Sequence, residues 1–213
     1  MSDVRQKLEA AIERLGNELP SSISPTTIQM IQEVADITDS EFSDDAMRIL
    51  TTFYPDYGGA NAGDALKMLE KFVERKNPMA MLELGKILRG SESSSYLARF
   101  GALAQQDRAR SFELIKTAQK IGSGWFDYTH YATMGFAYRE EKIRIDNGEI
   151  AGEKTGGAKW LEYVESDLAC MEKGLKWIND NMGGQYEQAE LRAQFEYQIE
   201  VCKDLLAAHQ KLK

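Results

Sequence analysis

Proline and β-type patterns are scarce in this 213-residue sequence. Only four prolines occur, and no run of alternating β-branched and polar residues predicts a strand. Proline interrupts helices because it lacks a backbone N–H and its ring clashes with the preceding turn. Apolar residues recur at helical spacing in most segments, and the sequence therefore predicts an all-α fold of stacked antiparallel helical hairpins or a compact bundle.

Cysteine and histidine are also rare, with two of each. Cys170 and Cys202 fall within helical patterns and are predicted to be reduced core residues, although a disulfide between them is also compatible with the sequence. His130 and His209 are far apart, and neither belongs to a His-x-x-x-His or Glu-x-x-His pair. We therefore expect no metal site, no cofactor and no catalytic residue, and we predict a protein that is not an enzyme.

Long hydrophobic runs are absent. No stretch of about 18 apolar residues occurs, so no membrane-spanning helix is predicted. The first seven residues are mostly polar and no long apolar segment follows them, which differs from a secretory signal. The composition, with 43% hydrophobic and 28% charged residues, is that of an ordinary globular protein. The expected location is the cytoplasm.

Basic residues are fewer than acidic ones, 26 against 34, which gives a net charge of -8. Residues 1–55 hold ten acidic and four basic side chains. Nucleic-acid binding requires a basic surface and is therefore not expected. A protein partner with a basic surface is the better electrostatic match, and a solvated acidic face without a partner is the alternative. The acidic candidates for partner binding are Asp36, Asp39, Asp44 and Asp45.

Glycine-rich stretches divide the chain. Tyr57–Gly63 and Asn147–Gly157 are predicted loops. They separate acidic helices in residues 1–57, repeat-like hairpins in residues 58–146 and a long helical hairpin in residues 147–213. We expect these three segments to form one continuous domain.

Capping residues predict where several helices begin. Three helices are expected to start at an N-cap residue, in two cases followed by proline: Ser24-Pro25, Asn77-Pro78 and Asp127. A further helix is expected to be capped at Ser43 and to end at Pro55.

The middle of the chain carries small residues and glycines in a pattern typical of stacked helical hairpins. Small residues occur where two helices would approach closely: Ala80, Gly85, Ser111, Ala118 and Gly135. Gly90 and Gly122 occur where helices would end, in a left-handed conformation that glycine adopts at little cost. Hairpin arrays of this kind mostly bind other macromolecules.

This pattern resembles Sel-one-like repeats, a branch of the tetratricopeptide superfamily. The residues that fit successive helices of such repeats are Ala80, Leu84, Gly85 and Gly90, then Asp107, Ser111, Ala118 and Gly122, then Met134, Gly135 and Tyr138. The resemblance covers about residues 64–140, and it departs from the family at Ser91–Gln106, where a long serine-rich connection replaces a short turn. The resemblance implies a short right-handed stack of hairpins that binds proteins. A generic array of helical hairpins is the alternative.

An aromatic helix that begins near Trp125 is the main candidate for partner binding. Consecutive helical residues cannot all face one core, so part of the aromatic cluster is expected at the surface, where aromatic side chains are favoured anchors. The candidate residues are Trp125, Tyr128, Tyr131, Tyr138 and Arg139. A groove lined by Tyr128, Tyr131 and Arg139 would support this role. Packing of the aromatic residues against the Ser91–Gln106 connection is the alternative.

These observations favour two functions. The first is a non-enzymatic protein–protein interaction module of the helical-repeat type. The alternative is an acidic inhibitory protein, such as an antitoxin, an immunity protein or a phage-encoded inhibitor, that neutralises a partner by direct binding. In the alternative, the acidic residues of the N-terminal segment would form the interface.

Overall fold

The computed structural model describes residues 2–18, 23–37, 41–57, 62–89, 107–122, 124, 126–182 and 186–211. Over these ranges every regular element is an α-helix, so the predicted all-α fold is confirmed. The chain forms two compact units, Met1–Ser123 and Gly124–Lys213. None of the helices in the described ranges is both long and apolar enough to cross a bilayer.

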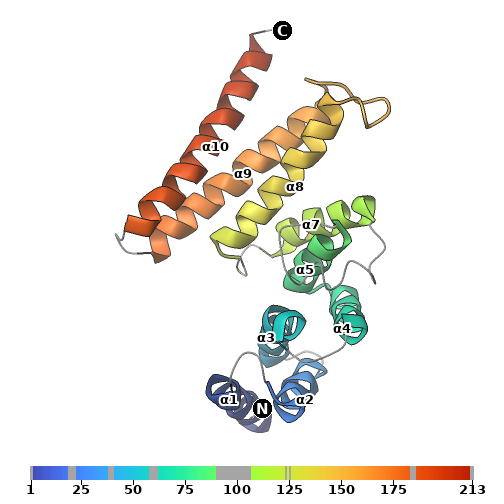
Figure 1. Cartoon of the computed structure of the whole chain (residues 1–213), viewed down its shortest axis with the longest axis vertical. Coiled ribbons are helices and arrows are strands. Elements are labelled where there is room, and N and C mark those ends of the chain that lie inside the picture. The colour runs from blue at the N-terminus through green and yellow to red at the C-terminus, as the bar shows by residue number, and fades with distance from the viewer. Residues whose placement is uncertain are drawn as a thin grey trace. The chain divides into compact units, whose positions relative to one another are not determined.

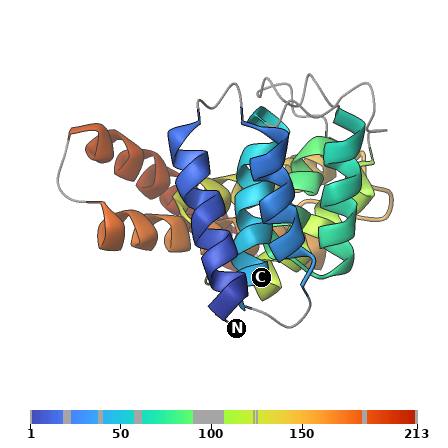
Figure 2. The ribbon, with the colours of Figure 1, turned by 90° about the horizontal axis from the view of Figure 1, so that it is seen from below.

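The first unit is an array of helices that pack mainly on their neighbours in sequence (Figure 1). Its described helices are α1 (Ser2–Asn17), α2 (Pro25–Ala35), α3 (Glu41–Tyr57), α4 (Ala62–Glu74), α5 (Pro78–Arg89) and α7 (Arg108–Ile121). Figure 2 shows α1, α2 and α3 lying side by side, and each of them contacts the other two. Helix α3 also packs on α4 and α5, and it therefore connects α1 and α2 with the later helices of this unit.

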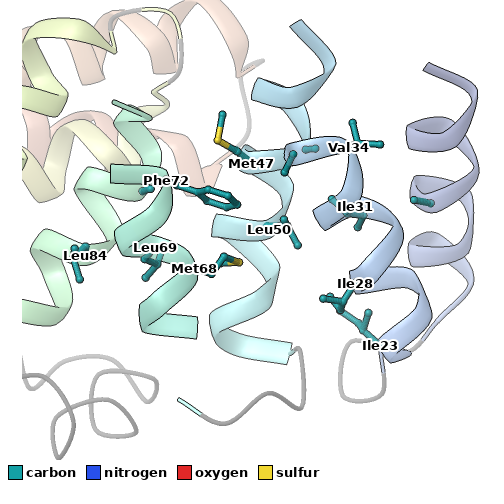
Figure 3. Close-up of a cluster of buried hydrophobic side chains, with 14 of the residues drawn as sticks. Ile23, Ile28, Ile31, Val34, Met47, Leu50, Met68, Leu69, Phe72 and Leu84 are labelled. Atoms are coloured by element: carbon teal, nitrogen blue, oxygen red, sulfur yellow. The ribbon is translucent and has the colours of Figure 1, made fainter. Parts of the chain in front are cut away.

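A continuous apolar core joins these helices. It extends from Leu8 in α1 to Leu88 in α5. In the close-up of Figure 3, Ile31 of α2 and Leu50 of α3 lie toward one another, and Phe72 of α4 lies on the other side of α3. The helical apolar periodicity of the sequence thus becomes one buried layer shared by consecutive helices.

Close approach of α5 and α7 depends on a glycine. A Cβ atom added to Gly85 would lie 2.8 Å from Ile115 Cγ1 and 3.2 Å from the Ser111 carbonyl oxygen. The buried Ser111 hydroxyl donates a hydrogen bond to the Gly85 carbonyl oxygen at 2.6 Å. Ala80 and Ala118 are fully buried. The close contact predicted at Gly85 and Ser111 is therefore confirmed.

The second unit contains three described helices: α8 (Tyr128–Asp146), α9 (Ala158–Asn181) and α10 (Tyr186–Gln210). Helix α9 is central, because α8 and α10 both pack along it, whereas they make little direct contact with each other among the described residues. A Cβ at Gly135 of α8 would lie 2.6 Å from Asp167 Oδ1, so glycine permits the close approach of α8 and α9. The predicted close contact at Gly135 is confirmed.

The predicted helix starts are mostly confirmed. Ser24 accepts a hydrogen bond from the Thr27 N–H at 3.2 Å and precedes a proline at the first position of α2. Asn77 likewise accepts from the Ala80 N–H at 2.9 Å. Asp107 and Asp127 cap α7 and α8 in the same way. Each side chain satisfies an N–H that has no partner within its own helix.

Three predictions about helix boundaries are wrong. Helix α3 begins at Glu41, not at Ser43, and continues to Tyr57 beyond Pro55. The Ser43 hydroxyl instead donates to the Ala35 carbonyl oxygen at 2.9 Å, so a tertiary acceptor replaces the expected capping contact. Gly122 ends α7 as expected, but its φ is −104° rather than the positive value of a left-handed residue. Its N–H donates to the Ala118 carbonyl oxygen, which continues the helical pattern.

The compact units and the predicted segments divide the chain differently. The boundaries predicted after residues 57 and 146 fall within units, whereas the units meet at residues 123 and 124. Helix α8, grouped with the repeat-like hairpins in the sequence analysis, packs along α9 in the second unit. The loop 147–157 joins these two helices. Gly90 and the Ser91–Gln106 connection lie outside the described ranges.

Replacing Gly85 by leucine tests the close contact between α5 and α7. We expect Gly85→Leu to lower the free energy of unfolding by about 1–3 kcal/mol, because the new side chain overpacks against Ile115 and the α7 backbone. Gly16→Leu in α1 is the control, since no atom lies within 4 Å of a Cβ at that position. Chemical denaturation followed by circular dichroism measures both. Equal midpoints for Gly85→Leu and wild type would contradict this packing.

Candidate functional site

The aromatic candidates on α8 lie mainly inside the second unit. Tyr131 and Tyr138 are buried. The Tyr138 ring lies 6.2 Å from the Tyr163 ring, centroid to centroid, and the Tyr131 ring lies edge-on to Phe126 at 6.0 Å. Both tyrosines therefore belong to the core of this unit rather than to its surface. Trp125 lies outside the described residues.

Tyr128 is half-buried at the start of α8. Its ring centroid lies 5.6 Å from that of Trp177 on α9 and 6.5 Å from that of Phe195 on α10. The tyrosine thus closes an aromatic cluster contributed by all three helices. The groove that the sequence analysis expected between Tyr128, Tyr131 and Arg139 is replaced here by packed aromatic side chains.

Arg139 forms an ion pair with a buried carboxylate that the sequence analysis did not select. Its Nε and Nη2 atoms donate to Asp167 of α9 at 3.0 and 3.1 Å. Gln198 of α10 donates to the same carboxylate at 3.0 Å, and the Cys202 thiol lies 3.6 Å from it. Side chains from α8 and α10 therefore converge on one acidic residue of α9. A signal was present, because Asp167 occupies a core-facing position between Val164 and Cys170.

The thiol in this cluster has a raised pKa. Burial, together with the negative charge of Asp167, raises the pKa of Cys202 to about 11. The thiol is therefore protonated near neutral pH and stands as a weak donor toward the carboxylate. Both cysteines are free and buried.

A cavity of about 150 Å³ lies between α8 and α10 above this cluster. Its lining comes from all three helices and combines apolar and polar side chains: Arg139, Lys142, Ile143, Tyr163, Val164, Asp167, Gln198, Val201, Cys202 and Leu205. Because α8 and α10 have little direct contact in the described part of the chain, their facing sides form an open groove over α9. We call this feature the α8–α10 groove.

Large apolar side chains stand exposed on α8 and α10, the two helices that form the walls of the α8–α10 groove. On α8, Phe136 is 48% and Ile143 is 45% exposed, and Arg139 lies on the same helix face between them. On α10, Tyr197 is 71% exposed and lies one turn before Val201 of the groove lining. Phe136, Ile143 and Tyr197 were not among the partner-binding candidates predicted from the sequence. Their seven- and four-residue spacings from other groove positions were the available signal.

The acidic candidates of the first unit are exposed where they are described. Asp36 forms an ion pair with Lys71 at 2.6 Å, and Asp45 lies 3.6 Å from Arg48. Asp44 is also exposed. Exposed pairs of this kind contribute only about 0–1 kcal/mol, so they leave the carboxylates available to a partner. Asp39 lies outside the described residues.

His130 has a structural contact. Its Nδ1 atom lies 2.5 Å from Asp127 Oδ1, within the capping box at the start of α8. Burial alone would raise the pKa of Asp127, but hydrogen bonds from His130 and Thr129 outweigh it and hold this pKa well below its usual range. Among the described residues, no group of three or more His, Cys, Asp or Glu side chains could hold a metal ion.

Comparison with known proteins found no matching family model, no matching curated protein and no matching solved structure. The resemblance to Sel-one-like repeats stays a prediction. The features that bear on function are therefore the α8–α10 groove and the exposed charges.

The buried carboxylate of the second unit is expected to be a major source of its stability. Asp167→Asn should lower the free energy of unfolding by about 2–3 kcal/mol, because the Arg139 guanidinium loses its charged acceptor in a buried setting. Glu165→Gln, on the exposed face of the same helix, should change it little. Denaturant titration of the two variants provides the measurement. Similar effects at both positions would show that the Asp167 cluster contributes no special stability.

Proposed function

We propose that this protein is a non-enzymatic protein–protein interaction module that binds a helix of its partner in the α8–α10 groove. The supporting observation is the lining of this groove, in which the exposed Ile143 of α8 lies across from Val201 and Leu205 of α10. Single exposed apolar residues are ordinary in soluble proteins, but a group of large ones beside a groove marks an interaction surface. We further propose a cytoplasmic location.

The arrangement of the groove favours a helical occupant. Helices α8 and α10 both pack along α9, and this leaves a position that a fourth helix would fill in a four-helix bundle. Ile143 lies on one wall, and Val201 and Leu205 lie one turn apart on the other. An amphipathic helix with apolar residues every three or four positions matches this spacing.

The burial of exposed side chains on binding sets the order of magnitude of the binding free energy. Fully burying a large apolar side chain contributes about 1.5–3 kcal/mol, and Ile143, Val201 and Leu205 of the groove lining are already partly covered. Association costs at least about 4 kcal/mol in lost freedom of the two partners. The apolar contacts alone therefore support weak binding, and polar contacts at the groove or elsewhere must add to it.

An acidic inhibitory protein is the second candidate function. The exposure of Asp44 and Asp45 on α3 favours it, because accessible carboxylates attract a basic target surface. The net charge of the chain, -8, acts in the same direction. In this case binding to the target would involve the first unit.

A single substitution at the groove tests the first proposal. The partner is identified by affinity capture from the native host, and its binding to purified variants is then measured by calorimetry. We expect Ile143→Glu to weaken binding at least about tenfold, because a charge enters the apolar wall of the groove. Ile12→Glu is the matched control, since Ile12 of α1 is also 45% exposed and lies in the first unit. Equal effects of the two substitutions would contradict binding at the groove.

Charge reversal on α3 tests the second candidate. With the captured partner, Asp44→Lys combined with Asp45→Lys should lower the association rate and its dependence on salt, because exposed charges act over about 8 Å at physiological ionic strength. The control reverses Glu165 and Glu172, two exposed residues of α9, and changes the net charge equally. Stopped-flow kinetics at several salt concentrations measures the association rate of both variants. An equal loss of rate in both variants would assign the effect to net charge rather than to α3.

A further inference from the structure

Two residues in the walls of the α8–α10 groove, Arg139 and Gln198, each have a polar group without a hydrogen-bond partner among the described residues. Arg139 uses Nε and Nη2 toward Asp167, and Nη2 also lies 4.0 Å from Met171 Sδ. Its Nη1 atom, with two N–H donors, has no partner in the described part of the chain. Gln198 points its Nε2 atom at Asp167 and Cys202, and its Oε1 atom has no partner there either.

Docking of a helix would remove water from these two groups. Arg139 is only partly exposed and Gln198 is half-buried, so a helix laid across the cavity would cover both. A purely apolar seam would leave Nη1 and Oε1 unsatisfied, and each such group weakens binding by roughly ten- to a hundredfold. The groove therefore disfavours an entirely apolar helix.

The charges around the groove are already neutralised. Arg139 is paired with Asp167, and Lys142 is paired with Asp146 at 2.8 Å. A carboxylate from the partner would satisfy Arg139 but would add an unbalanced negative charge beside Asp167 and would offer no donor to Gln198. A lysine or arginine would donate to Gln198 but would lie against the Arg139 guanidinium. An amide has both a carbonyl oxygen and an N–H₂ group and carries no charge.

We propose that the α8–α10 groove selects a partner helix whose apolar seam is interrupted by one Asn or Gln, placed over Arg139 and Gln198. This inference rests on the proposed function. The amide oxygen accepts from Arg139 Nη1 and the amide nitrogen donates to Gln198 Oε1, while the neighbouring seam residues contact Ile143, Val201 and Leu205. A single buried polar residue in an apolar seam fixes the register of a helix against its partners.

The occupant is a helix of another protein rather than a second copy of this chain. The second unit contains 16 acidic and 11 basic residues. Two copies would therefore bring like net charges together, which disfavours their association. Lysine or arginine on the outer positions of a foreign helix would instead complement the acidic unit.

A displayed library of helical peptides tests this specificity. The probe is a set of 17-residue amphipathic helices with Leu and Ile in the seam, Lys on the outer positions and all twenty amino acids at the central seam position. Selection uses the full-length protein, and sequencing gives the enrichment of each central residue. We expect Asn and Gln to be enriched at least fivefold over Leu, Asp and Lys. The selection is repeated on the Gln198→Leu variant, which keeps the Arg139–Asp167 pair. There the enrichment of Asn and Gln should fall and the enrichment of Leu should rise.

The outcomes separate the two proposals. Enrichment of any central residue other than Asn or Gln, with selection lost on Ile143→Glu, overturns the amide preference and leaves groove binding intact. An amide preference that persists unchanged on Gln198→Leu also overturns the inference. No enrichment above the starting library, or enrichment that Ile143→Glu does not affect, contradicts both the inference and the proposed function. Circular dichroism establishes that each variant keeps its helical content.

Discussion

The position of Asp167 within α9 constrains the second unit. Its carboxylate accepts from Arg139 on one neighbouring helix and from Gln198 on the other. Gly135 lets α8 approach close enough for the first contact, because a Cβ there would meet the carboxylate. The two outer helices are thereby tied to the central helix rather than to each other. The α8–α10 groove, and the proposals built on it, depend on this arrangement.

Local features of the fold could be predicted from the sequence. The caps at Ser24, Asn77 and Asp127 depend on residues within three positions of one another, so sequence neighbours determine them. The tight contacts at Gly85 and Gly135 were also predictable, since only small side chains allow two helix backbones to approach closely. The two long helices α9 and α10 were expected because their apolar residues recur at helical spacing, and α8 was expected from its cap at Asp127.

Features that depend on distant residues were not predictable. Ser43 was expected to cap a helix, yet its hydroxyl bonds the Ala35 carbonyl oxygen eight residues away. Tyr131 was a candidate surface residue but is buried, because the aromatic helix packs along α9. The partner of Arg139 is 28 residues away, and no local pattern specifies that pairing. For the same reason, the candidate groove involves residues that periodicity alone did not select.

The Cys202 thiol is a weaker acid than an ordinary cysteine, and this has a practical consequence. With a pKa of about 11, only about one thiol in ten thousand is ionised at pH 7, and the thiolate is the form that reacts with alkylating reagents and oxidants. Burial restricts access as well. Reaction at this cysteine is therefore expected to be slow in the folded protein, and local opening of the second unit would accelerate it. The rate at which a thiol reagent modifies Cys202 would then report how often this unit opens.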